Sequence, residues 1–179
     1  MNTKRFYLSI TFIFTLLTAV FICFAVIKDK GIFITLAVTF GTCLYHFAVR
    51  LAVGGVIPKK FNYKSAWFME KSFENGLYKK LKVKKWKQNA PTYNPKTYSS
   101  QQCTLEEIVN TTCRNEVIHE VNMLLSFVPL VLIIPFGTPA AFIITSIAGC
   151  ICDFFFVILQ RYNRPRLIKL IQRKNNKTH

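Results

Sequence analysis

Four long apolar runs constrain this chain more than any other feature of its sequence. They cover residues 6–27, 31–56, 121–136 and 140–159, and charged segments separate the first three of them, while a short Gly-Thr-Pro stretch separates the last two. At roughly 1.5 Å per helical residue, the first run reaches about 33 Å, enough to cross a hydrocarbon core of about 30 Å. Because lipid offers no partner to exposed backbone groups, runs of this length are typical of helices. The sequence therefore predicts an all-α integral membrane protein with about four membrane helices.

The two N-terminal runs predict two spans. The run 6–27 lacks a small-x-small cleavage site before Lys28 and is longer than the apolar part of a usual signal peptide, so we expect it to be retained. The run 31–56 is apolar except for His46 and Arg50, which lie four residues apart on one helix face. Either Arg50 extends to the headgroups while His46 packs, or both face the polar end of a helix bundle.

The two C-terminal runs predict a helical hairpin. The run 121–136 has 16 residues and contains Pro129 and Pro135, so it either crosses fully or is partly re-entrant. Gly-Thr-Pro at 137–139 predicts a tight turn. The run 140–159 returns to the same side, which places residues before 121 and after 159 at one membrane depth.

The polar segment 57–120 is predicted to lie at the membrane interface. Between Lys59 and Lys96 it holds eleven lysines and two acids, Glu70 and Glu74, with aromatic residues interleaved. This pattern favours short amphipathic helices at Trp67-Phe68-Met69 and at Leu77 to Val83, with aromatics at headgroup depth and lysines against anionic lipid. Because membrane spans flank these lysines, we expect no nucleic-acid partner.

Charge also predicts the orientation of the chain. Thr104 with Glu107 three residues later is a capping-box pattern, which predicts a helix running from there towards the third apolar run. The tail 160–179 carries seven Lys and Arg and no acid, and basic segments prefer the cytoplasmic side. We expect one membrane domain over 1–179, multi-pass in the cell membrane, with both termini cytoplasmic.

Several polar residues gather at this predicted depth. Glu116 and His119 are three residues apart on one helix face, and a histidine beside a carboxylate is suited to activating a hydroxyl. Arginines next to them would bind a phosphate or an oxyanion. The alternative is an interfacial salt bridge and a basic anchor. The spacing of Cys and His predicts no metal site, and we expect no cofactor. The candidate arginines are Arg114, Arg161 and Arg164.

At these residues the sequence resembles a known family. The string Gln160-Arg-Tyr-Asn-Arg-Pro-Arg-Leu167 resembles the C-terminal signature of glycosyl-4,4'-diaponeurosporenoate acyltransferases. The segment Glu74-Asn-Gly76 followed by Val83-Lys-Lys-Trp-Lys87 and Pro91 resembles a central block, and Arg114-x-Glu116-x-x-His119 a third. Together they cover about half of the chain. The chain departs from the family pattern at Glu120, because the pattern has an aromatic residue at this position.

The resemblance implies transfer of a fatty acyl group, with acyl-CoA as the expected donor, to a sugar hydroxyl of a membrane-borne glycoside such as a glycosylated C30 carotenoid acid. In this hypothesis His119 is the general base, oriented by Glu116. The residues expected to bind the substrates are Arg114, Arg161, Asn163, Arg164 and Trp86. The competing hypothesis is a non-catalytic membrane protein that binds anionic lipid or tethers a pathway partner.

Overall fold

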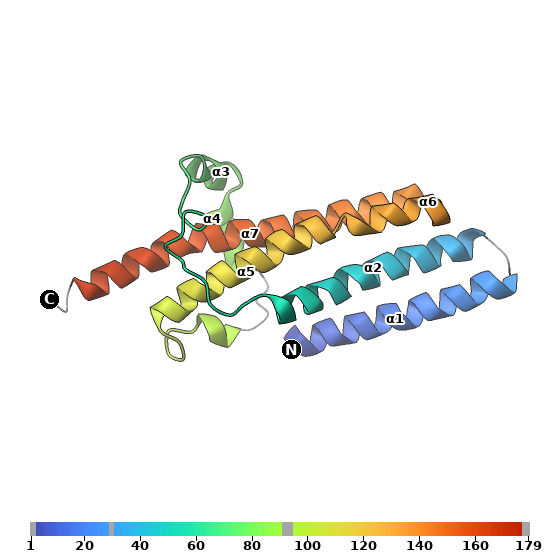
Figure 1. Cartoon of the computed structure of the whole chain (residues 1–179), viewed down its shortest axis with the longest axis horizontal. Coiled ribbons are helices and arrows are strands. Elements are labelled where there is room, and N and C mark those ends of the chain that lie inside the picture. The colour runs from blue at the N-terminus through green and yellow to red at the C-terminus, as the bar shows by residue number, and fades with distance from the viewer. Residues whose placement is uncertain (1–2, 29–30, 91–94, 177–179) are drawn as a thin grey trace. The chain divides into compact units, whose positions relative to one another are not determined.

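The computed structural model describes residues 3–28, 31–90 and 95–176, and every regular element in this part of the chain is a helix (Figure 1). Residues 29–30, between the first two apolar runs, and Pro91 of the central block lie outside the described residues. Four helical stretches are long and apolar enough to cross a membrane, which confirms the predicted class. They are Tyr7–Lys28, Gly31–Val56, Leu105–Phe136 and Pro139–Asn175.

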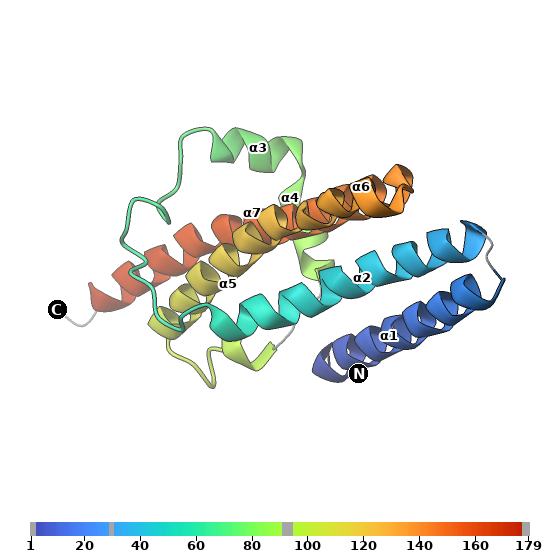
Figure 2. The ribbon, with the colours of Figure 1, turned by 45° about the vertical axis from the view of Figure 1, so that its right-hand side comes forward.

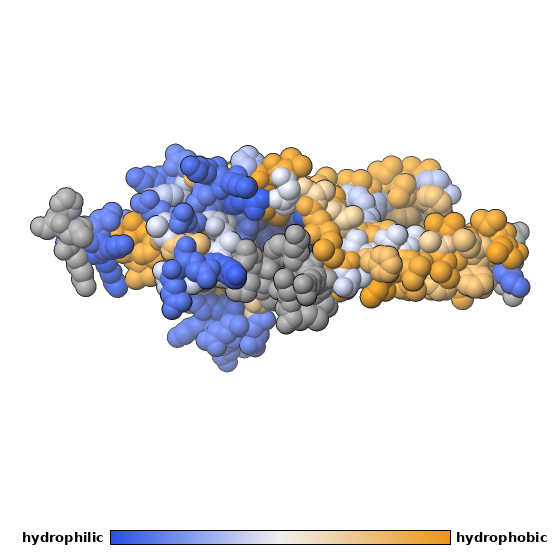
Figure 3. All heavy atoms as spheres, turned by 90° about the horizontal axis from the view of Figure 1, so that it is seen from below, coloured by the Kyte–Doolittle hydropathy of each residue, from blue (hydrophilic) through white to orange (hydrophobic). Residues whose placement is uncertain are grey.

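The helices group into two compact units, each described separately below. The first unit comprises Met1–Val56 and Val121–Asp153, and the second comprises Ile57–Glu120 and Phe154–His179. Apolar side chains cover much of the first unit's outer surface, as Figure 3 shows. Ile134 and Val26 are 88% and 80% exposed. An outer surface of this kind suits lipid rather than water.

In the first unit, α1 (Thr3–Lys28) and α2 (Gly31–Val56) form an antiparallel hairpin and lie side by side in Figures 1 and 2. Threonine hydroxyls along both helices donate to the carbonyl four residues earlier, which satisfies these polar groups inside an apolar span. Aromatic rings contact one another along the hairpin in the pairs Tyr7–Phe47, Phe14–Phe47, Phe21–Phe40 and Phe24–Phe33.

The third apolar run is broken at its proline, as its sequence predicts. Helix α5 (Leu105–Leu125) ends before a 3-10 segment η3 (Val128–Leu132) and the short α6 (Ile133–Phe136). Pro129 has no N–H, so the carbonyl of Leu125 lacks the helical partner that another residue at 129 would supply. The hydroxyl of Tyr45 donates to that carbonyl at 3.0 Å instead. Gly137 and Thr138 then turn the chain with positive φ angles.

Helix α7 (Pro139–Asn175) is longer than predicted, because it continues through most of the basic tail. Within the first unit, its Asp153 forms an ion pair with Arg50, whose guanidinium also donates to the carbonyls of Gly149 and His46. A charge inside an apolar span is stabilised by such a partner. A methyl group at Gly149 would lie 3.1 Å from both the His46 ring and the Ser126 hydroxyl, so the helices meet there because this residue has no side chain.

The second unit contains short helices within the segment 57–120. They are α3 (Glu74–Lys80) and α4 (Val83–Trp86), followed by the 3-10 turns η1 (Lys87–Asn89) and η2 (Pro95–Tyr98). The capping box at the start of α5 is confirmed: the Thr104 backbone N–H donates to the Glu107 carboxylate at 2.7 Å, and the Glu107 backbone N–H donates to the Thr104 hydroxyl. Residues 67–69, expected to be helical, form turns instead.

Candidate functional site

The candidate site lies in the second unit, where the first part of α5 packs against the later part of α7. Figures 1 and 2 show the two helices side by side, and their contacts run in antiparallel register. Thr112 contacts Arg164, Glu116 contacts Arg161, and His119 contacts Phe156. The family-like blocks of α5 and the tail therefore meet, as the predicted hairpin requires.

Glu116 lies at the centre of this contact. Its side chain is fully buried, and each of its carboxylate oxygens accepts from a different arginine. Oε1 accepts from Nη1 of Arg161 at 2.5 Å, and Oε2 accepts from Nη2 of Arg164. Since a buried carboxylate is costly without compensating charge, the two arginines account for how Glu116 is tolerated there.

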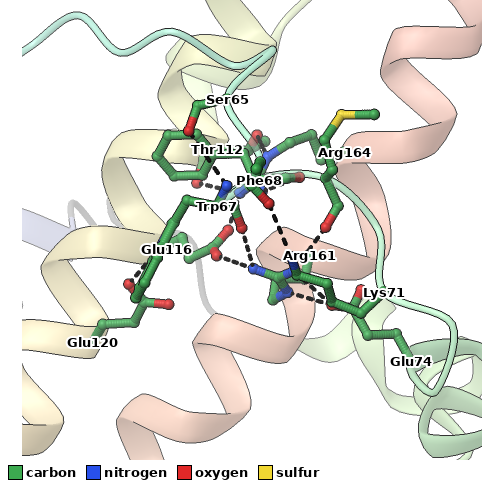
Figure 4. A network of polar contacts seen from close by, with 12 residues as sticks. Ser65, Trp67, Phe68, Lys71, Glu74, Thr112, Glu116, Glu120, Arg161 and Arg164 are labelled. Atoms are coloured by element: carbon green, nitrogen blue, oxygen red, sulfur yellow. Dashed lines mark hydrogen bonds and ion pairs between the residues drawn. The ribbon is translucent and has the colours of Figure 1, made fainter.

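Arg161 uses its whole guanidinium in this network, as Figure 4 shows. Nε donates to Glu74 at 2.8 Å, and Nη1 donates to Glu116 and to the Trp67 carbonyl. Nη2 donates to the Met69 carbonyl at 3.0 Å and approaches Glu74 within 2.6 Å. The guanidinium of Arg161 has five N–H donors and makes five contacts with acceptor oxygens, so each donor can have a partner.

Arg164 is equally committed and is only 1% exposed. Its Nε and Nη2 donate to the hydroxyl and the carbonyl of Thr112, and its Nη1 donates to the Phe68 carbonyl at 3.1 Å. Its guanidinium also lies over the Phe68 ring, 4.9 Å from the centroid. Arg161 and Arg164 together with Glu74 and Glu116 carry no formal net charge.

These bonds explain why residues 67–69 are not helical. A helix would use their carbonyls internally, whereas here all three accept from Arg161 or Arg164. We call residues Trp67–Phe73 the aromatic loop. Its turns present carbonyls to the two arginines, so the tertiary contact determines the local backbone.

Glu74 is a member of this network that lies in a family-like block and received no role from the sequence. It is 3% exposed, pairs with Arg161, and accepts a 2.7 Å hydrogen bond from the Tyr78 hydroxyl. Burial and this bond to Glu74 raise the pKa of Tyr78 well above its usual range. A signal was present, since Glu74 is one of two acids in a segment with eleven lysines.

His119 lies one turn beyond Glu116 on α5. Its ring stacks on Phe156 with the centroids 4.7 Å apart and an interplanar angle of 13°, and the residue is half-buried. Stacking fixes the plane of the imidazole while leaving part of it accessible. The Glu116 oxygens meet Arg161 and Arg164, so the carboxylate expected to orient the histidine is used mainly to hold the arginines.

A second polar group lies beside the first and was not anticipated. The Tyr98 hydroxyl donates to Gln160 at 3.2 Å and accepts from the Asn115 amide at 2.5 Å. Burial raises the pKa of Tyr98. Asn115 lies four residues before His119 and Gln160 four residues after Phe156, so this group adjoins the stacked histidine along both helices.

The remaining predicted site residues lie around these groups. Arg114 is half-buried on α5, about 200° around the helix from Glu116, and faces another direction. Asn163 is half-buried on α7 and is seven residues after Phe156, so it shares the face that carries the histidine stack. Trp86 is half-buried, donates to the Leu81 carbonyl at 3.1 Å, and packs against Phe155.

The fold and this site define an all-helical integral membrane protein with a buried arginine–glutamate network. The chain belongs to the glycosyl-4,4'-diaponeurosporenoate acyltransferase family, whose model matches residues 64–173. That range contains the whole network and the histidine stack. The family description gives the class of activity as acyl transfer. No curated protein and no solved structure shows a significant match to the chain.

Proposed function

We propose that this protein transfers a fatty acyl group from acyl-CoA to a sugar hydroxyl of a membrane-borne glycoside, such as a glycosylated C30 carotenoid acid. The family match over residues 64–173 carries this proposal, because it covers the aromatic loop, both helices of the site and His119. The proposed donor is water-soluble and anionic, while the proposed acceptor dissolves in the bilayer. A polar site on helices that also carry long apolar stretches suits a reaction between two such substrates.

His119 is the proposed general base. It would take the proton of the sugar hydroxyl as the oxygen attacks the thioester carbonyl, and the carbon–sulfur bond would then break. The thiolate of coenzyme A would leave and recover the proton from the imidazolium, so the histidine returns to its starting form. The support for this role is an imidazole that is half-buried, stacked on Phe156, and next to the Tyr98–Gln160 group.

We assign Arg114 a different role from Arg161 and Arg164. Arg161 and Arg164 direct their donors at Glu74, Glu116 and backbone carbonyls, so we assign them to holding the site together, with the 15%-exposed side chain of Arg161 as the part open to substrate. Arg114 and Asn163 are half-buried and are proposed to contact the donor phosphates or the oxyanion. Trp86 would offer apolar ring surface to the substrate.

The proposed topology places this site on the cytoplasmic face of the cell membrane. Basic residues are concentrated in the second unit, and both termini would be cytoplasmic under the positive-inside bias. Acyl-CoA is available on that side. Labelling of introduced cysteines by a membrane-impermeant reagent in intact and broken cells tests this orientation.

Mass spectrometry of lipids and pigments tests the activity. Cells that make the glycoside acceptor would express the wild type, His119→Ala, His119→Gln, or the control Gln172→Ala at an exposed position of α7. We expect wild type and control to accumulate the acylated glycoside, and both histidine variants to lose about 10²- to 10⁴-fold in rate. Full acylation by a His119→Ala protein that is present in the membrane would refute the proposed mechanism.

The competing function is a non-catalytic membrane protein that binds anionic lipid or tethers a partner. The observation that favours it is that Arg161 and Arg164 are committed internally, while most of the described lysines of the second unit are exposed. Purified protein in lipid nanodiscs, given acyl-CoA and the glycoside, separates the two functions. Release of the free thiol of coenzyme A supports the enzyme, and its absence with intact, folded protein supports the competitor.

A further inference from the structure

The aromatic loop exposes large apolar side chains in the lysine-rich part of the second unit. Trp67, Met69 and Phe73 are 60%, 51% and 67% exposed, whereas Phe68 between them is 7% exposed. The loop thus turns one side chain inward onto Arg164 and three outward. Exposed apolar groups clustered within seven residues and bordered by charge are typical of a surface that binds something.

The loop is held by hydrogen bonds and is therefore not a random protrusion. The carbonyls of Trp67 and Met69 accept from Arg161 at 3.1 and 3.0 Å, and the carbonyl of Phe68 accepts from Arg164. The Trp67 indole N–H donates to the Glu120 carboxylate at 3.1 Å. These bonds attach the loop to Glu120 of α5 and to Arg161 and Arg164 of α7. They therefore fix where the outward side chains lie relative to these two helices.

Those positions determine the depth of the loop. Glu120 is directly followed by the apolar run 121–136, and Arg161 comes two residues after the apolar run 140–159. The residues that hold the loop therefore lie, in the sequence, beside the start of the third apolar run and the end of the fourth. A tryptophan fixed at that level, with its N–H bonded and its ring exposed, has the placement that this side chain prefers at a membrane surface.

Charge around the loop indicates which lipid it meets. Lys64 and Lys71 are exposed on either side of Trp67 and Met69, and Lys71 donates to the Ala66 carbonyl, which keeps its ammonium beside the loop. The segment from Lys59 to Lys96 holds eleven lysines and two acids, and one of these acids, Glu74, is buried against Arg161. Apolar groups bordered by lysines match an anionic headgroup layer.

We propose that the aromatic loop inserts Trp67, Met69 and Phe73 into the headgroup region of an anionic bilayer leaflet, and that Arg161 and Arg164 act as positioning residues that hold its backbone at that depth. This inference is independent of acyl transfer, because it concerns where the second unit contacts lipid. It also explains why Arg161 and Arg164 donate to the backbone carbonyls of the aromatic loop.

Tryptophan fluorescence in reconstituted vesicles tests the proposal with the full chain. The protein has two tryptophans, so the difference between wild type and Trp67→Phe isolates the signal of Trp67 while Trp86 stays in its packed position. Vesicles would contain phosphatidylcholine with or without phosphatidylglycerol, and lipids brominated near the headgroup would serve as quenchers. Aqueous iodide would report exposure to water.

We expect brominated lipid to quench the Trp67 signal strongly and iodide to quench it weakly, with more lipid quenching when phosphatidylglycerol is present. Strong iodide quenching without lipid quenching would overturn the proposal and leave a protein or solute partner for this surface. Equal lipid quenching in both vesicle types would overturn the assignment of anionic lipid. Because Phe73 is exposed and outside the arginine network, Phe73→Trp in the Trp67→Phe background provides a second probe, for which we expect the same pattern.

Discussion

Removing the negative charge of Glu116 should destabilise the second unit strongly. Glu116→Gln keeps the size of the side chain and one acceptor oxygen but leaves the network with one excess positive charge. Arg164, which is 1% exposed, then loses the carboxylate that compensates its burial. The remaining acid of the network, Glu74, pairs with Arg161 and does not contact Arg164.

The expected size of this effect follows from the burial of both partners. Breaking a buried ion pair by removing one charge costs about 3–5 kcal/mol, since the other charge stays buried without compensation. The oxygen retained by glutamine still accepts one hydrogen bond, which favours the lower end, about 3 kcal/mol. In a chain of this size each kcal/mol lowers the melting temperature by roughly 2–4 °C, so we expect a drop of about 6–12 °C.

Thermal unfolding in lipid nanodiscs, followed by circular dichroism, measures the change. The matched control is Glu106→Gln, the same substitution in the exposed first turn of α5, which should melt like the wild type. A Glu116→Gln protein that melts within error of this control would refute the reasoning, because it would show that the buried carboxylate carries no net stabilisation.

A second variant tests whether charge balance is the cause. Glu116→Leu combined with Arg164→Met removes one charge of each sign and leaves Arg161 paired with Glu74. Apolar replacement of a complete buried pair is often nearly neutral. We therefore expect the double variant to melt closer to the wild type than Glu116→Gln does. A double variant that is less stable than Glu116→Gln would indicate that the hydrogen bonds to the loop matter more than the charge.

Two further predictions concern other parts of the chain. Gly149→Ala should lower stability in the same assay because its methyl group would lie 3.1 Å from the His46 ring, whereas Gly55→Ala, with open space around it, should raise stability slightly through better helix propensity. The raised pKa of Tyr78 means that its phenol stays protonated in the folded protein above the ordinary value near 10, so stability should fall as the pH rises past that value. Ultraviolet absorbance of phenolate against pH measures this, and Tyr78→Phe should remove one late-titrating phenol while that of Tyr98 remains.

Sequence alone determined the membrane class and the start of one helix, for local physical reasons. A bilayer requires apolar runs of a certain length, so the runs 6–27, 31–56 and 140–159 could be identified without any knowledge of packing. The capping box of Thr104 and Glu107 is equally local, because all its bonds lie within four residues. The break at Pro129 follows from the missing N–H of proline.

Only the tertiary structure decided which charges meet and what the arginines do. Glu116 and Arg164 are 48 residues apart, and nothing local distinguishes an arginine that binds substrate from one that binds a buried glutamate and backbone carbonyls. The same contact overrode the helix expected at residues 67–69 by drawing their carbonyls to Arg161 and Arg164. A buried charge must be compensated by whatever the fold brings to it, and this partner choice is a property of three-dimensional packing.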